Sequence, residues 1–205
     1  MIGNKILAAM AMASSALLFS GCAMNDMNHD MASAPMATAM PAEQTVMVGG
    51  AAMYPSRNII ENAVNSRDHT TLVAAVRAAG LVETLSGPGP FTVFAPTNAA
   101  FDKLPPGTVD TLVQPANRPT LTRILTYHVV PGRLTAADLA QRIRAGNGRA
   151  VLTTVQGATL TVTESGGHVI VNDSAGGTST VTTADVLQSN GVIHVVDTVL
   201  MPPQA

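Results

Sequence analysis

The sequence predicts an α+β fold for residues 55 to 203, and two observations support it. Apolar residues recur with a helical period from Pro55 to Ala145, and with a period of two from Arg149 onward. Helices grouped before a run of strands are typical of α+β domains, whereas regular alternation of the two would favour a parallel sheet. Aromatic residues make up 3% of the chain and tryptophan is absent, so the core must consist of Val, Ile, Leu and Ala.

Residues 1 to 21 have the pattern of an export signal. Lys5 precedes an uncharged apolar run that, at about 14 residues, is shorter than the roughly 20 needed to span a bilayer. The chain's only cysteine, Cys22, directly follows Leu-Phe-Ser-Gly, which resembles the lipobox of bacterial lipoproteins. That resemblance implies cleavage before Cys22 and lipid on its thiol, whereas the alternative is an ordinary secreted protein.

Residues 22 to 54 are predicted to form a flexible tether. They are rich in Ala, Met, Pro and Gly and show no sustained period, which is typical of unstructured segments. Ala23 stands where Asp typically retains lipoproteins at the inner membrane, so the resemblance implies the outer membrane. We therefore expect a lipid-anchored domain held away from the membrane, on its periplasmic or surface face.

The tether also carries a candidate metal site. Met24, Met27, His29 and Met31 lie within eight residues, and thioether sulfur suits Cu(I). Envelope copper handling is therefore an alternative function. Methionine is also common in exported linkers, and the neighbouring carboxylates of Asp26 and Asp30 are hard ligands. We expect no cofactor on the folded domain.

Three helices and one strand are predicted before residue 146. The first helix follows Asp68 or Thr70 as cap and ends at Gly80, and the second begins near Asn117-Arg118-Pro119. The third runs from about Thr135, its cap, to Ala145. Between them, residues 91 to 95 form a β-branched and aromatic strand. The inward positions of the helices are Leu72, Val73, Val76, Ala79, Leu121, Ile124, Leu125, Leu139 and Ile143.

The residues after Arg149 are predicted to form a meander of strands. The segments AVLTTV, ATLTVTES, HVIVND, STVTTADV and GVIHVVDTVLM are separated by QG, SGG, SAGG and SNG. Glycine, asparagine and serine at these positions suit hairpin turns.

The charge balance disfavours nucleic acid as a partner. Without residues 1 to 21 the chain has one base fewer, 10 Lys and Arg against 13 Asp and Glu, and no basic tract. Phosphate binding depends on clustered cations.

Three ordered motifs resemble the signatures of the fasciclin domain. They are FTVFAPTNAAFDKL at 91 to 104, LTRILTYHVVPGRL at 121 to 134 and NGVIHVVDTVLMP at 190 to 202. The resemblance covers essentially all of residues 55 to 203. It implies a wedge, built as a curved β-sandwich of about seven strands with several packed helices. It also implies adhesion or scaffolding without catalysis, with an unidentified protein or polysaccharide as ligand; the oligomeric state stays open.

Several motif residues have local structural interpretations. Thr97 or Asn98 can accept a backbone N–H to start a short helix that buries Phe101. Asn190-Gly191 suits a turn with positive φ. Alternation after this turn sends Val192, His194, Val196 and Thr198 to one face, and the intervening residues to the other, as in a central strand covered on both sides.

The family resemblance also supplies candidate contact residues. In animal members an Asp-Ile type dipeptide before the last signature and the tyrosine-histidine segment are proposed receptor contacts. The corresponding residues here are Asp185-Val186 and Tyr127-His128. The loop before Asn190 is accordingly a candidate contact surface.

Catalytic interpretations are weaker. His128 and His194 could form a metal or catalytic pair, but each lies in an apolar context where a buried, backbone-bonded imidazole is the default. We expect His128 to be buried and to bond a neighbouring segment. A hydrolase is least favoured, because Ser174 and Ser189 lie in turns without a G-x-S-x-G motif. Asp185 and Asp197 show no pattern of paired acids.

Overall fold

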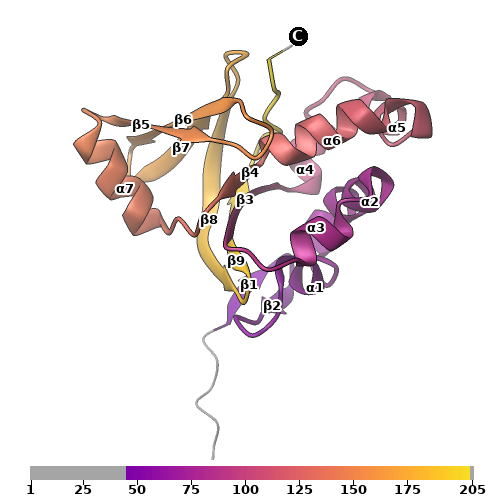
Figure 1. Cartoon of the computed structure of the whole chain (residues 1–205), viewed down its shortest axis with the longest axis horizontal. Coiled ribbons are helices and arrows are strands. Elements are labelled where there is room, and N and C mark those ends of the chain that lie inside the picture. The colour runs from indigo at the N-terminus through magenta and orange to yellow at the C-terminus, as the bar shows by residue number, and fades with distance from the viewer. Residues whose placement is uncertain (1–44, 204–205) are drawn as a thin grey trace, which may run out of the picture. The chain divides into compact units, whose positions relative to one another are not determined.

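A mixed seven-stranded β-sheet, with both antiparallel and parallel strand pairs, forms the centre of the computed structural model (Figure 1). The structure describes residues 45–203. The predicted signal, the lipidation site Cys22 and the candidate ligands Met24, Met27, His29 and Met31 lie outside the described residues. The described part belongs to one compact unit, Pro41–Ala205. No helix within residues 45–203 combines the length and apolarity needed to cross a bilayer.

The sheet has the strand order β4-β3-β9-β8-β7-β6-β5, and only β3 and β9 run parallel. The Val155 N–H donates to the Val129 carbonyl at 2.8 Å, which joins the chain after β5 to β4 at the opposite edge. The sheet is therefore nearly closed, and the expected α+β fold with about seven strands is confirmed. Its strands are β3 Phe91–Pro96, β4 Val129–Pro131, β5 Arg149–Thr153, β6 Thr159–Ser165, β7 His168–Asn172, β8 Thr178–Gln188 and β9 Gly191–Val196.

The helices divide into two groups (Figure 1). The helix α7 packs on β5, β6 and β7, and the other six lie on the opposite side of the sheet. The helices are α1 Ile59–Ala63, α2 Thr70–Ala79, α3 Val82–Ser86, α4 Asn98–Asp102, α5 Thr108–Leu112, α6 Arg118–Tyr127 and α7 Ala136–Ala145. Short 3-10 turns, Arg67–His69 and Pro115–Asn117, precede α2 and α6.

The predicted helices are confirmed in position. Gly80 ends α2 in the left-handed region at φ 74°, which glycine adopts without steric cost. Thr135 caps α7 through a reciprocal pair of bonds with Asp138. The cap of α2 differs from the prediction. Neither Asp68 nor Thr70, the two predicted cap residues, makes a side-chain cap hydrogen bond to this helix.

Two hydrophobic cores lie on the two faces of the central strands. The first core lies between the helices α1, α2, α4 and α6 and one face of β3 and β9; the second lies inside the curved sheet, under α7. Ile193 and Val195 point into the first core and Val196 into the second. All six residues of β9 are buried, which confirms the predicted central strand covered on both faces.

A hairpin of β1 Val46–Val48 and β2 Ala51–Met53 corrects the predicted tether, which was expected to reach residue 54. The side chains of Val48 and Met53 are buried in the first core. The Arg67 N–H donates to the Gly49 carbonyl at 3.2 Å, and buried Asn62 bonds both backbone groups of Tyr54. The folded domain therefore begins before residue 55.

Candidate functional site

Tyr127 and His128 lie where α6 ends and β4 begins, and both side chains are buried. The Tyr127 hydroxyl donates to the Thr159 carbonyl at 3.0 Å and accepts from the Ser174 N–H at 3.1 Å. It thereby links α6 to β6 and to the turn between β7 and β8. A contact role for these two side chains, expected from the family resemblance, is wrong for this structure because neither reaches the surface.

His128 bonds the backbone through both ring nitrogens. Its Nδ1–H donates to the Ile124 carbonyl at 2.8 Å, and its Nε2 accepts from the Leu200 N–H at 2.9 Å. This pattern requires the neutral ring. Burial lowers the pKa of His128 to about 4, although the Ile124 carbonyl and the nearby Asp173 carboxylate act in the opposite direction. The expected buried position and backbone partners are confirmed.

His194 has the opposite tautomer. Its Nε2–H donates to the Leu134 carbonyl at 2.7 Å, and its Nδ1 accepts from the Asp185 N–H at 3.4 Å. The ring stacks on Phe94, with centroids 5.7 Å apart. Burial lowers the pKa of His194 as well, against the effects of the Leu134 carbonyl and Asp185. Neither nitrogen of His194 or His128 is free to act as a ligand or base.

Asp185 and Val186 lie in an irregular part of β8, where the predicted loop before Asn190 proves to be strand. Asp185 adopts a φ of 56°, and its Oδ1 accepts from the Ala136 N–H at 2.6 Å, in the first turn of α7. Val186 is 1% exposed and belongs to the first core. The expectation that Val186 contacts a partner is therefore wrong, and Asp185, which is half-buried, positions α7.

Asn190 and Gly191 hold the start of β9, but neither has the expected positive φ. Asn190 accepts from the Ile59 N–H at 3.1 Å and donates to the Leu85 and Gly87 carbonyls at 2.8 and 3.0 Å. A Cβ on Gly191 would lie 2.1 Å from the Phe91 carbonyl oxygen. Glycine is needed here for the close approach of β3, not for a left-handed turn.

Asn98 was predicted to cap α4, but its side chain bonds the start of α2 instead. Its Oδ1 accepts from the Thr71 N–H at 3.0 Å, and its Nδ2 donates to the Arg67 carbonyl at 2.8 Å. Asn98 thus supplies the missing cap of α2. Thr97 precedes α4 without a side-chain cap bond, while Phe101 is buried as expected.

The serines and acids considered for catalysis all have hydrogen-bond partners within the fold. Ser174 lies 3.2 Å from the Tyr127 hydroxyl, and Ser189 donates its N–H to the Arg57 carbonyl. Burial would raise the pKa of Asp197, but bonds from the Thr180 N–H, Thr198 and Lys103 lower it overall. Within residues 45–203, no three His, Cys, Asp or Glu side chains lie close enough together to hold a metal.

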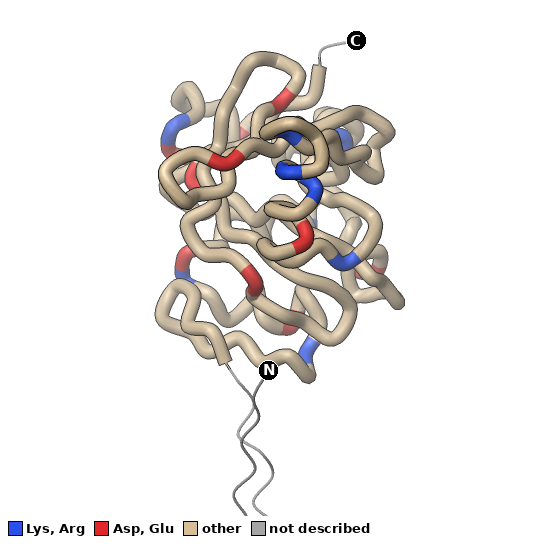
Figure 2. The backbone as a smooth tube through the Cα atoms, turned by 90° about the vertical axis from the view of Figure 1, so that its left-hand side faces the viewer, with Lys and Arg blue, Asp and Glu red and all other residues tan. Residues whose placement is uncertain are grey.

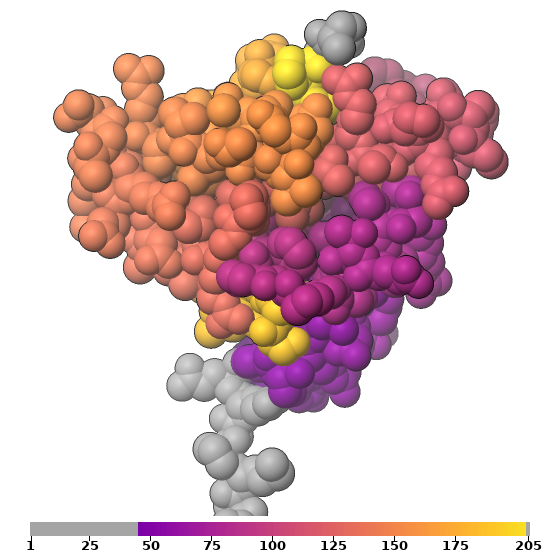
Figure 3. Space-filling view, in the orientation of Figure 1, coloured from indigo at the N-terminus to yellow at the C-terminus, as the bar shows by residue number. Residues whose placement is uncertain are grey.

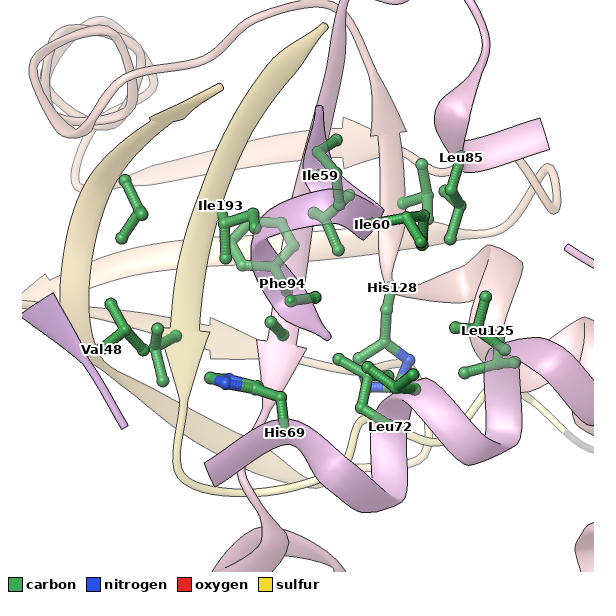
Figure 4. Close-up of a pocket in the computed structure, with 18 of the residues that line it drawn as sticks. Val48, Ile59, Ile60, His69, Leu72, Leu85, Phe94, Leu125, His128 and Ile193 are labelled. Atoms are coloured by element: carbon green, nitrogen blue, oxygen red, sulfur yellow. The ribbon is translucent and has the colours of Figure 1, made fainter. Parts of the chain in front are cut away.

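A cavity in the first core is a feature that the sequence analysis missed (Figure 4). Aliphatic side chains from both sides of this core line it, together with the rings of Phe94 and of the buried His69 and His128. Pattern analysis could not find it, because His69 follows a polar stretch, Ser66-Arg67-Asp68, that has no apolar period.

Comparison with known proteins identifies related chains. The sequence model described as the fasciclin domain matches residues 67–202. Protein sll1483 of Synechocystis is 46% identical over 84% of this chain and 89% of its own length. The cell surface glycolipoprotein MPB83 of Mycobacterium bovis is 34% identical over 83% of this chain and 79% of its own.

The fold also matches a solved structure, a FAS1 domain pair from the insect cell adhesion molecule fasciclin I. The TM-score is 0.64 at 19% sequence identity, over 78% of this chain and 58% of the insect chain. At this identity the likeness shows the fold alone.

Proposed function

This chain belongs to the fasciclin domain family, and from that membership we propose that it is a lipid-anchored binding module at a bacterial cell surface, acting without catalysis. The observation that carries the proposal is its 34% identity with MPB83, which is described as a cell surface glycolipoprotein. The lipobox-like segment before Cys22 supports the same anchoring. Several acyl chains would hold such a protein stably at a membrane.

The positions of the buried polar side chains support binding over catalysis. His128, His194 and Tyr127 each bond backbone groups of distant segments, so their chemistry serves the fold. Charged residues are scattered among neutral ones in the view of Figure 2. A contact surface must therefore consist of exposed side chains outside the buried motif positions.

We place this surface where the β1–β2 hairpin adjoins β8. Met47, Tyr54 and Leu187 are 63%, 37% and 40% exposed, and β2 contacts β8. Figure 3 shows the end of β8 and the start of β9 reaching the surface beside the indigo hairpin. Exposed methionine, tyrosine and leucine side chains suit a protein partner. They suit a polysaccharide less well, because Arg57 lies 4.7 Å over the ring of Tyr54 and covers one face of the ring.

The contact surface can be tested by adhesion of cells that display the chain at equal abundance. We expect adhesion to a layer of envelope protein, and a clear loss with Leu187→Ser. Val151→Ser is the matched control, because Val151 is 61% exposed on β5, away from the hairpin. Adhesion to envelope polysaccharide but not to envelope protein would contradict a protein partner. Equal adhesion of cells that lack the chain would contradict an adhesion role.

The charge of Asp185 needs a separate variant. Asp185→Ala would remove the bond to α7, whereas Asp185→Asn keeps an acceptor for the Ala136 N–H and tolerates a positive φ. Reduced adhesion with Asp185→Asn would therefore assign a contact to the charge itself. Unchanged adhesion would leave Asp185 with its structural role only.

Anchoring is tested independently with Cys22→Ser. We expect this variant to lose incorporation of labelled fatty acid and to leave the membrane fraction. Labelling that persists in Cys22→Ser would refute lipidation at this residue.

A further inference from the structure

The cavity of the first core lies between the helices and the sheet (Figure 4). Its lining includes Ile59 of α1, Leu72 of α2, Leu85 of α3 and Ile193 of β9, and almost all of the lining surface is apolar. The cavity volume is about 40 Å³, several times the roughly 10–15 Å³ that one water molecule needs on this measure. The apolar cavity known to take up benzene measures about 150 Å³, so this smaller cavity suits a molecule of only a few heavy atoms.

His69 differs from the other two buried histidines. The side chain is 4% exposed and lines the cavity, and its Nδ1 lies 2.8 Å from the Ser66 hydroxyl. Its Nε2 is buried and lacks a hydrogen-bond partner. Both ring nitrogens of His128 and of His194 have hydrogen-bond partners, so the unpaired Nε2 distinguishes His69 from them. A buried donor or acceptor without a partner is destabilising, and a suitable ligand would supply the missing bond.

The groups around His69 determine whether a ligand must donate or accept a hydrogen bond. The Ala95 carbonyl favours a proton on the ring, but it lies outside hydrogen-bond geometry with Nε2. The Ser66 hydroxyl can donate to Nδ1, which leaves the hydrogen on Nε2. Nε2–H then offers a donor to the cavity, and its complement is an oxygen acceptor such as a ketone, an aldehyde or an ether.

We propose that this cavity binds a small apolar molecule that carries one oxygen acceptor, held by a hydrogen bond from His69 Nε2. The hairpin supplies Val48 and Met53 to the lining, so the segment before residue 55 helps to enclose the ligand. Ile60 and Val73 in the lining are only half-buried, which places the way in between α1 and α2. The site is separate from the exposed surface proposed for adhesion, and either proposal can fail without the other.

Two probes of similar size separate the hydrogen bond from simple apolar filling. Acetone carries the acceptor, and isobutene, which has nearly the same shape, does not. Each is titrated by methyl NMR into the whole chain carrying Cys22→Ser. We expect both to shift the methyl signals of Leu72 and Ile193, and neither to shift those of Leu160 and Val171 in the second core.

The matched variant is His69→Leu, which removes the donor and keeps an apolar lining. We expect the affinity for acetone relative to isobutene to fall about fivefold, the effect of one hydrogen bond. A change in cavity size affects both probes alike, so it leaves the ratio of their affinities unchanged. Unchanged methyl signals from the second core show that the variant folds. The proposal is overturned if neither probe shifts the cavity methyls of the wild type, or if His69→Leu leaves the ratio unchanged.

Discussion

Acidification is expected to destabilise the domain through His128. The folded-state pKa is about 4 against 6.5 in the unfolded chain, so the unfolded chain binds a proton first as the pH falls. The free energy of unfolding therefore decreases below about pH 6.5 and levels off below about pH 4. The difference of 6.5 − 4 = 2.5 units corresponds to about 3.4 kcal/mol at 1.36 kcal/mol per unit. Roughly 3 kcal/mol of this is lost by pH 4.

The geometry explains why protonation is unfavourable. A proton on Nε2 would face the Leu200 N–H, which currently donates to it at 2.9 Å. The Asp173 carboxylate offsets only part of the burial effect. Protonation therefore breaks the bond that holds the segment after β9 to the end of α6.

The assay is urea unfolding of wild type and His128→Gln between pH 7.5 and 4. Glutamine can still donate to Ile124 and accept from Leu200, but it does not titrate. Burial also lowers the pKa of His69 and His194, so only the difference between the two profiles reports His128. Tyr127→Phe is the control, because it removes buried bonds and should keep the wild-type pH slope. Parallel profiles for wild type and His128→Gln would refute the reasoning.

Three further comparisons test the structure by urea unfolding at neutral pH. Asn98→Ala should cost about 1–2 kcal/mol as the lost cap of α2, whereas Thr97→Ala should cost much less; equal costs would contradict the cap assignment. Gly191→Ala should destabilise by at least about 2 kcal/mol, since its Cβ meets a backbone oxygen of β3, and a neutral effect would show that β9 can shift. Residues 55–205 should be about 3–6 kcal/mol less stable than residues 45–205, because Val48 and Met53 are removed from the core; equal stability would make the hairpin dispensable.

The elements that could be predicted are those whose signal is local. The period of α2 and α6, the cap at Thr135 and the turns between β5 and β8 depend on residues within one helix or hairpin. The buried His128 was predictable for a similar reason, since an imidazole among β-branched residues must find a backbone partner.

The elements that could not be predicted depend on distant partners. The hairpin at 46–53 is short, and only its packing on α1 and the first core distinguishes it from a tether. Asn98 looks like the cap of its own helix, and its partners at 67 and 71 become visible only in three dimensions. The cavity beside His69 is likewise a property of the packed core.

The polar residues of the family motifs join parts of the chain that are far apart in sequence. His194 to Leu134, His128 to Leu200 and Asn190 to Ile59 are bonds across 60, 72 and 131 positions. Closing such long loops costs entropy, and each satisfied buried bond makes the closed arrangement specific, because a misplaced partner would leave a buried polar group unpaired. The motifs that identify the family therefore describe how the sheet and helices are held together. The two binding sites proposed above lie where these motifs do not reach, at the exposed hairpin and beside His69.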